Sequence, residues 1–251
     1  MLVEEPAREH RAGARMSALS GFAFAVLLVV ALVLFRQGPG LGMPDSTYAR
    51  FYADGHGSVL VTAGLYVVPF AGITFLWHVS ATRTLIDELP GPRSEVPRWL
   101  QVTSGVVFVC MMFAGSAAVG AVALLTVFSS TPLPPPDVAR ALSSAGYGLV
   151  FVFGVRAAGM YMIATTRLAR VRELLPRWLA VVSYLAATFL LVSTTFHPAI
   201  LLVFPGWVVL LSVVLLLEAR RRPTTPGPLP RAHTVPTPLA PEVHHDHDDR
   251  A

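Results

Sequence analysis

Six long blocks of apolar residues constrain the fold of this chain more than any other feature. A helix needs about 20 apolar residues to cross a hydrocarbon layer of about 30 Å. The sequence is 54% hydrophobic and only 14% charged, whereas a soluble domain uses about a quarter of its residues for charge. We therefore predict an all-α polytopic membrane protein, a bundle of six transmembrane helices. The predicted spans are 17–35, 58–79, 102–128, 147–166, 178–195 and 199–217.

The arginines between these blocks predict the orientation. All 19 basic residues are arginine, and basic residues concentrate in cytoplasmic loops of membrane proteins. If the N-terminus is cytoplasmic, Arg36, Arg50 and Arg140 lie in outer connections and Arg156 lies within a span. The other 15 arginines then lie in cytoplasmic segments. We therefore predict a multi-pass protein of the cell membrane with both termini in the cytoplasm.

The two ends of the chain are polar. Residues 1–16 form the predicted cytoplasmic N-terminal segment, and the first apolar block is longer than the core of about 7 to 15 residues found in signal peptides. We therefore expect an uncleaved anchor rather than a secretory signal. Residues 218–251 are rich in proline, threonine and charge, a composition typical of disorder. Their last part, 244–249, contains histidine and aspartate and either binds a divalent metal loosely or is a solvated end without fixed ligand geometry.

Other composition features exclude several classes of site. Cys110 is the only cysteine, so the chain forms no internal disulfide and no cysteine-based metal site. Basic residues form no stripe interleaved with aromatic residues, so nucleic acid is not an expected partner. We expect no metal and no cofactor within the membrane domain. The expected partners are the lipid bilayer and either another membrane protein or further copies of the chain.

Arg156 is the most unusual residue of the predicted bundle. It lies near the middle of the fourth span, where a charged side chain costs about 2.5 to 3.5 kcal/mol, and no aspartate or glutamate lies within any predicted span. Pro69 lies at a similar depth and, lacking an N–H, frees the carbonyl of Leu65. Tyr66 and Thr188 lie at neighbouring depths. We predict that these residues form an intramembrane polar cluster around Arg156.

Two roles for this cluster remain open. An interior arginine can join helices through hydrogen bonds as a structural residue. An arginine without a carboxylate partner can also bind the carboxylate or phosphate group of a ligand. Small residues at 115–120 and 157–159 predict the closest helix contacts. Four residues of the first outer connection either cap the bundle or bind a partner or ligand, and both roles stay open; they are Tyr48, Phe51, Tyr52 and Asp54.

Several stretches of the sequence resemble a group of uncharacterised actinobacterial multi-pass membrane proteins. These stretches are 51–54, 64–77, 156–161, 175–180 and 204–208. The resemblance covers about 45–217 and implies a helical membrane protein. It brings no family activity with it.

Three classes of function are compatible with the sequence. The first is a non-enzymatic membrane component or partner subunit, which fits the lack of a phosphate loop, a dinucleotide glycine motif and a nucleophile elbow. The second is a small-molecule transporter or anionic-ligand binder that uses Arg156. The third is a membrane-embedded enzyme. A cavity that reaches Arg156 would distinguish the second and third classes from the first.

Overall fold

The computed structural model describes residues 5–88, 95–129, 132–193, 197 and 199–221, and in these residues the regular elements are all helical. The all-α prediction is confirmed for this part of the chain. The helices are α1 (Glu5–Phe35), α2 (Asp45–Ala53), α3 (Ser58–Thr62), η1 (Ala63–Val67), α4 (Val68–Asp87), α5 (Glu95–Phe128), α6 (Pro136–Gly148), η2 (Leu149–Gly154), α7 (Val155–Val171), α8 (Arg177–Val192) and α9 (Ile200–Arg221).

Five helical segments among the described residues are long and apolar enough to cross a membrane, and they overlap five of the six predicted spans. They are Gly13–Phe35, Ser58–Asp87, Glu95–Phe128, Pro136–Val171 and Ile200–Glu218. The predicted span 178–195 corresponds to α8, which is apolar but has only 16 residues. At 1.5 Å per residue, α8 is about 24 Å long, shorter than the hydrocarbon layer of about 30 Å. The last residues of this predicted span, 194–195, lie outside the described residues.

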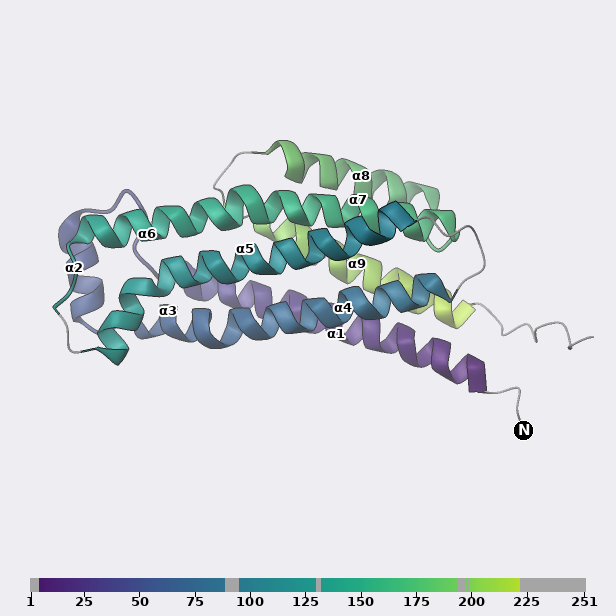
Figure 1. The fold of residues 1–251 in the computed structure, drawn as a ribbon, viewed down its shortest axis with the longest axis horizontal. Helices are drawn as coiled ribbons and strands as arrows, with labels where there is room; N and C mark the ends of the chain where they lie inside the picture. The colour runs from purple at the N-terminus through teal and green to yellow at the C-terminus, as the bar shows by residue number, and fades with distance from the viewer. Residues whose placement is uncertain (1–4, 89–94, 130–131, 194–196, 198, 222–251) are drawn as a thin grey trace, which may run out of the picture.

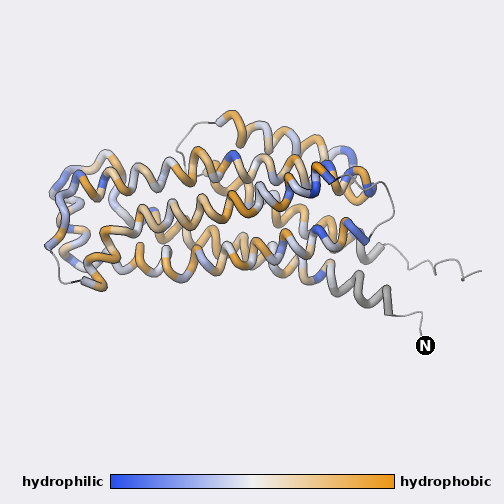
Figure 2. The backbone as a smooth tube through the Cα atoms, viewed as in Figure 1, coloured by the Kyte–Doolittle hydropathy of each residue, from blue (hydrophilic) through white to orange (hydrophobic). Residues whose placement is uncertain are grey.

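The long helices run side by side along the length of the bundle (Figure 1). α1 packs against α4 and α9, α5 packs against α4, α6 and α7, and α8 packs against α7. The start of α1 and the end of α9 lie at the same end, whereas α2 lies at the opposite end (Figure 1). Apolar residues cover the middle of the helices, and the hydrophilic residues gather mainly near the two ends (Figure 2).

Two π turns, η1 and η2, interrupt two of the long helices without breaking them. At the end of η1 the Val68 N–H bonds the carbonyl of Ala63, five residues back, directly before Pro69. At the end of η2 the Val155 N–H bonds the carbonyl of Val150 in the same way. Proline cannot donate to the preceding turn, and a wider π turn accommodates this without ending the helix. The helix from Ser58 to Asp87 is therefore continuous.

Glycine allows the closest crossings between helices. A Cβ added to Gly115 of α5 would lie 2.9 Å from the carbonyl oxygen of Gly146 on α6, and a Cβ added to Gly146 would lie 2.6 Å from the carbonyl oxygen of Gly115. A Cβ on Gly159 of α7 would lie 3.0 Å from the Ala187 carbonyl oxygen on α8. The predicted close contacts at 115–120 and 157–159 are confirmed at Gly115 and Gly159.

The short helix α2 caps the end of the bundle that lies opposite to the start of α1 (Figure 1). Tyr48 and Tyr52 are buried against residues of α3, α5 and α6. Arg140 of α6 is joined to α2 by an ion pair with Asp45 at 2.6 Å, and its guanidinium lies 5.1 Å from the centre of the Tyr48 ring. Its other ion pair, with Asp137 at 2.8 Å, lies within α6. Of the two roles left open for this segment, the burial of Tyr48 and Tyr52 fits capping.

Candidate functional site

An apolar cavity of about 370 Å³ lies within the bundle, in the half that is nearer to α2. Its walls are residues from the end of α1, the middle of α5, the stretch from α6 through η2 to α7, and the start of α9. The wall residues are mainly leucine, valine and phenylalanine, and the polar contributions come from Arg36, Ser116 and Tyr147. Such a surface favours an apolar ligand with a small polar end.

The cavity follows from the lengths of the last two helices. α8 and the start of α9 stop short of the end where α2 lies, whereas α5 and α6 continue to it (Figure 1). Leu190 near the end of α8 and Ile200 at the start of α9 line the cavity. The parts of α1 and η2 that are nearer to α2 therefore face a space that neither α8 nor α9 fills.

An aromatic cluster lies beneath the cavity. Phe108 and Phe204 line the cavity and contact each other at a ring distance of 4.8 Å. Phe75 contacts both of these rings and also Tyr161, at distances of 5.2 to 5.4 Å. Most of these pairs have the edge-to-face geometry that aromatic rings prefer. Phe24 also packs against Phe75, with the two rings tilted at 43°. The cluster fills the middle of the bundle from α1, α4, α5, α7 and α9.

A neutral polar layer lies on the other side of the aromatic cluster. The His78 ring stacks on Phe75, and its Nδ1 donates to the Ser17 carbonyl at 2.9 Å. The Ser17 hydroxyl bonds the Thr82 hydroxyl at 2.8 Å. A Cβ at Gly21 would lie 2.3 Å from the Ser212 hydroxyl and 2.9 Å from His78 Nδ1. Gly21 is therefore the residue that lets α1, α4 and α9 converge around these buried groups.

A second part of this layer joins α5 to α7. Gln101 Nε2 donates to the Thr165 hydroxyl at 3.2 Å, and both side chains are fully buried. Tyr161 of the aromatic cluster is also fully buried. The side chains that form this layer, as described above, carry hydroxyl, amide and imidazole groups and no carboxylate. Within the described residues no group of three potential metal ligands is close enough to hold an ion.

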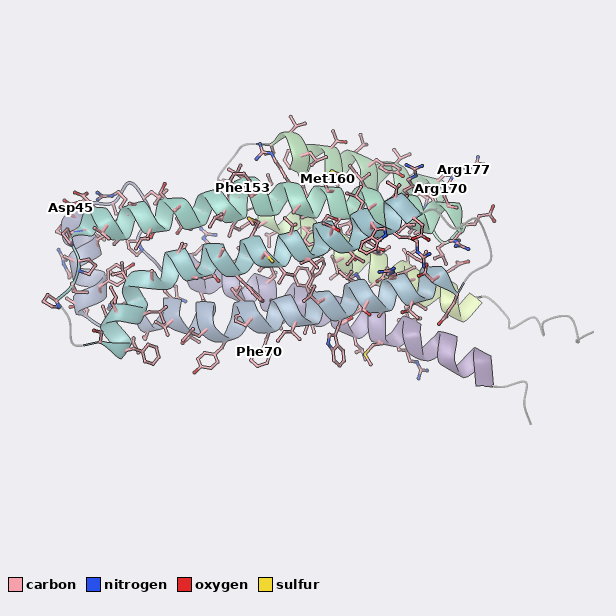
Figure 3. All side chains as sticks on the ribbon, in the orientation of Figure 1. Asp45, Phe70, Phe153, Met160, Arg170 and Arg177 are labelled. Carbon is pink, nitrogen blue, oxygen red and sulfur yellow. The ribbon has the colours of Figure 1, made fainter. Side chains whose placement is uncertain are left out.

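Arg156 lies outside the cavity. Its Nη1 donates to the carbonyl of Val152 on its own helix at 2.9 Å, and its side chain is half-buried. The cavity-facing residues of α7 are Val155 and Ala158, and at 3.6 residues per turn Arg156 points about 130° away from their mean direction. Phe153, one turn earlier, points away from the bundle (Figure 3). The expected carbonyl acceptor is present, but it belongs to Val152 rather than to Leu65.

The other residues of the predicted cluster form no hydrogen bond with Arg156 in the described part of the chain, and two of them are exposed. Tyr66 is 60% exposed and Thr188 is exposed on α8, so neither side chain lies in the bundle interior. Pro69 is half-buried at the start of α4, next to the exposed Phe70 that Figure 3 labels. No described hydrogen bond joins Arg156, Tyr66 and Thr188. Their role in binding a ligand remains a prediction. None of them lines the apolar cavity.

The sequence analysis did not identify the cavity residues, because each is an ordinary apolar residue of a span. One feature of the sequence could have indicated a cavity at this end of the bundle. Only three residues connect the fifth and sixth predicted spans, and so short a connection leaves the outer end of the bundle without cover from those two helices. Arg36 and Tyr147, each next to an apolar block, would then have been candidates for the rim.

The chain matches no protein-family model, no curated protein and no solved structure.

Proposed function

We propose that this protein is a non-enzymatic component of the cell membrane that binds a lipophilic molecule in the cavity between α1, α5, η2 and α9. The observation that carries the proposal is an apolar cavity of about 370 Å³. Ligand-binding cavities commonly measure about 300 to 1,000 Å³ and are lined mainly by apolar side chains with a few polar groups. An acyl or isoprenoid chain has the shape and chemistry that this cavity accepts.

The rim of the cavity favours a ligand with one polar end. Arg36 is exposed at the end of α1 and lines the cavity together with Tyr147. A guanidinium donates up to five hydrogen bonds and accepts none, so it suits a carboxylate or phosphate. The proposed ligand is therefore an amphiphile whose chain lies against Phe108 and Phe204 and whose polar end lies near Arg36.

Binding is favoured over passage through the bundle. The aromatic cluster fills the space between the cavity and the polar layer, since Phe75 contacts Phe108, Phe204 and Tyr161. A route for a ligand through the bundle would require these rings to separate. A membrane component that holds a lipid, alone or as the subunit of a larger assembly, needs no such movement.

The proposed topology is six crossings with both termini in the cytoplasm. The start of α1 and the end of α9 lie at the same end of the bundle (Figure 1), which an even number of crossings requires. Arg170 and Arg177 lie at that end and Asp45 at the other (Figure 3). The excess of arginine favours the cytoplasmic side for this end. In this arrangement α8 is the fifth crossing and a short one, and the cavity lies in the outer half of the membrane.

Filling the cavity tests the proposal. Leu32 lines the cavity, whereas the next residue, Val33, is 56% exposed on the outer side of α1. Leu32→Trp should reduce the cavity, and Val33→Trp is the matched control with the same added volume. Wild-type protein and both variants are purified in mild detergent and examined by native mass spectrometry for bound hydrophobic molecules.

The expected result is a lipophilic adduct on the wild type and on Val33→Trp that is lost from Leu32→Trp. Circular dichroism checks that all three proteins keep their helical content. If Leu32→Trp and the wild type carry the same molecules in the same amounts, the cavity is not the binding site and the proposal is wrong.

A further inference from the structure

A stripe of side chains on η2 and α7 points away from the bundle. Its members follow the helical repeat, three or four residues apart, and are half-buried or exposed; they are Phe153, Arg156, Met160, Ile163 and Arg167. The residues between them are buried. α5 and α8 pack against the other sides of α7. The stripe is therefore the part of α7 that no described helix of this chain covers.

Arg156 lies in the middle of this stripe and near the middle of the membrane. Along the helical segment Pro136–Val171 it is about 14 Å from Tyr147 and about 16 Å from Arg167, at 1.5 Å per residue. Tyrosine and arginine are typical of the two membrane surfaces, and the hydrocarbon layer between these surfaces is about 30 Å thick. The head groups of lipids are therefore too distant to bind Arg156.

Most of the hydrogen-bonding capacity of Arg156 is unused in this structure. Its Nη1 donates to the Val152 carbonyl at 2.9 Å. A guanidinium has five N–H donors, and Nε and Nη2 form no hydrogen bond or ion pair with any described residue. Hydrocarbon offers no acceptor to these donors. Another molecule must supply one at this depth.

A second copy of the chain does not provide a carboxylate at this depth. The acidic residues of the five long apolar segments lie at the segment ends and are Asp87, Glu95, Asp137 and Glu218, and α8 contains no acidic residue. Charged residues within membranes commonly pair with one another, and arginine binds a carboxylate through two parallel hydrogen bonds. The matching partner is an aspartate or glutamate within the transmembrane helix of a different protein.

We propose that the outward stripe of η2 and α7 binds a transmembrane helix of a different protein, through an ion pair between Arg156 and a carboxylate in the middle of that helix. Phe153 on one side of Arg156 and Met160 and Ile163 on the other supply apolar surface for the packing of the two helices. The inference does not depend on the apolar cavity, because Arg156 does not line it.

Photocrosslinking tests the proposal with the full chain in the membrane of its native cells. The photoreactive residue p-benzoylphenylalanine replaces Phe153, which is 58% exposed and lies one turn from Arg156 on the stripe. The matched control carries the same residue in place of Phe70, which is 56% exposed on a different helix, α4 (Figure 3). Each form is made with Arg156 intact, with Arg156→Leu and with Arg156→Lys. Mass spectrometry identifies the crosslinked peptides.

We expect the probe at Phe153 to crosslink a transmembrane peptide of another protein that contains aspartate or glutamate, and the probe at Phe70 not to do so. Arg156→Leu should lower the crosslinking yield about tenfold, the effect of one charge-assisted hydrogen bond, and Arg156→Lys should retain part of the yield. Replacing the partner's carboxylate by an amide should lower the yield by a similar factor. That substitution leaves this chain unchanged, so misfolding of this chain would not explain the loss.

Four results overturn the proposal. They are crosslinks to lipid alone, crosslinks to a second copy of the chain, crosslinks to a peptide without an acidic residue, and an equal yield in wild type and Arg156→Leu. Circular dichroism of the purified variants checks that Arg156→Leu keeps the helical content of the wild type.

Discussion

Gly146→Ala should destabilise the bundle strongly, because it places a Cβ where α6 crosses α5 and where Gly115 and Gly146 face each other. The new Cβ would lie 2.6 Å from the Gly115 carbonyl oxygen, 2.6 Å from Val119 Cγ2 and 3.1 Å from the Val119 nitrogen. Two of these atoms belong to the backbone of α5, so no change of rotamer removes the clash. Reaching an ordinary contact of 3.4 Å requires α5 and α6 to move apart by about 0.8 Å, which forfeits a quarter to a half of each dispersion contact across the crossing. We expect a loss of about 2 kcal/mol, within the usual range for overpacking.

Gly148→Ala provides the control, two residues further along. A Cβ there meets no atom within 4 Å, so alanine should be neutral or should stabilise the helix by about 0.5 to 1 kcal/mol. Both variants are unfolded reversibly by titration with sodium dodecyl sulfate, and helix content is followed by circular dichroism. If Gly146→Ala is as stable as Gly148→Ala, the close packing of α5 against α6 is not present.

Four further predictions address other parts of the molecule. Gly21→Ala should lower stability, because the added methyl group would lie 2.3 Å from the Ser212 hydroxyl. Combining it with Ser212→Ala should recover part of the loss. Additive losses in the double-mutant cycle would contradict this. Arg140→Gln removes the ion pair with Asp45 that joins α6 to α2, so amide hydrogen exchange in α2 should accelerate while the long helices remain protected. Burial raises the pKa of Tyr52 to about 12 from 10.0. Since the phenol of the unfolded chain ionises first, the free energy of unfolding should be constant below pH 10 and should fall as the pH rises from 10 to 12. A tyrosinate absorbance change near pH 10 that is lost in Tyr52→Phe would refute the burial. Arg156→Leu should leave the free energy of unfolding unchanged or raise it. The change removes one hydrogen bond to the residue's own helix and also a charge that costs about 2.5 to 3.5 kcal/mol in a membrane. A loss of more than about 2 kcal/mol would indicate a partner on another helix.

Much of the fold could be predicted from the sequence, because membrane solvation acts on local composition. A block such as 102–128 contains no charged residue and must form a helix in hydrocarbon, where every backbone group needs an internal partner. Small residues such as Gly115 and Gly159 similarly mark close crossings. The partner of Gly115 could not be predicted, because the pairing with Gly146 depends on how α6 lies over α5.

The site was less predictable, for a physical reason. The sequence analysis ranked residues by the cost of burying charge, and this criterion selected Arg156. The carbonyl of Val152, which lies in the π turn η2, accepts a hydrogen bond from Arg156, and this bond offsets part of that cost within one helix. The cavity, in contrast, depends on helix lengths: α8 has 16 residues and α5 has 34. The burial of His78 and Gln101 could not be predicted either, because it depends on hydrogen bonds to other helices that satisfy part of their polarity.

The central claim is that the cavity between α1, α5, η2 and α9 holds a lipophilic molecule. Cryo-electron microscopy of the protein in native lipid, with an antibody fragment bound to provide mass, tests it most directly. The account predicts elongated density in the cavity that contacts Phe108 and Phe204 and ends near Arg36. A map in which α1 and η2 close onto each other and leave no cavity would contradict it.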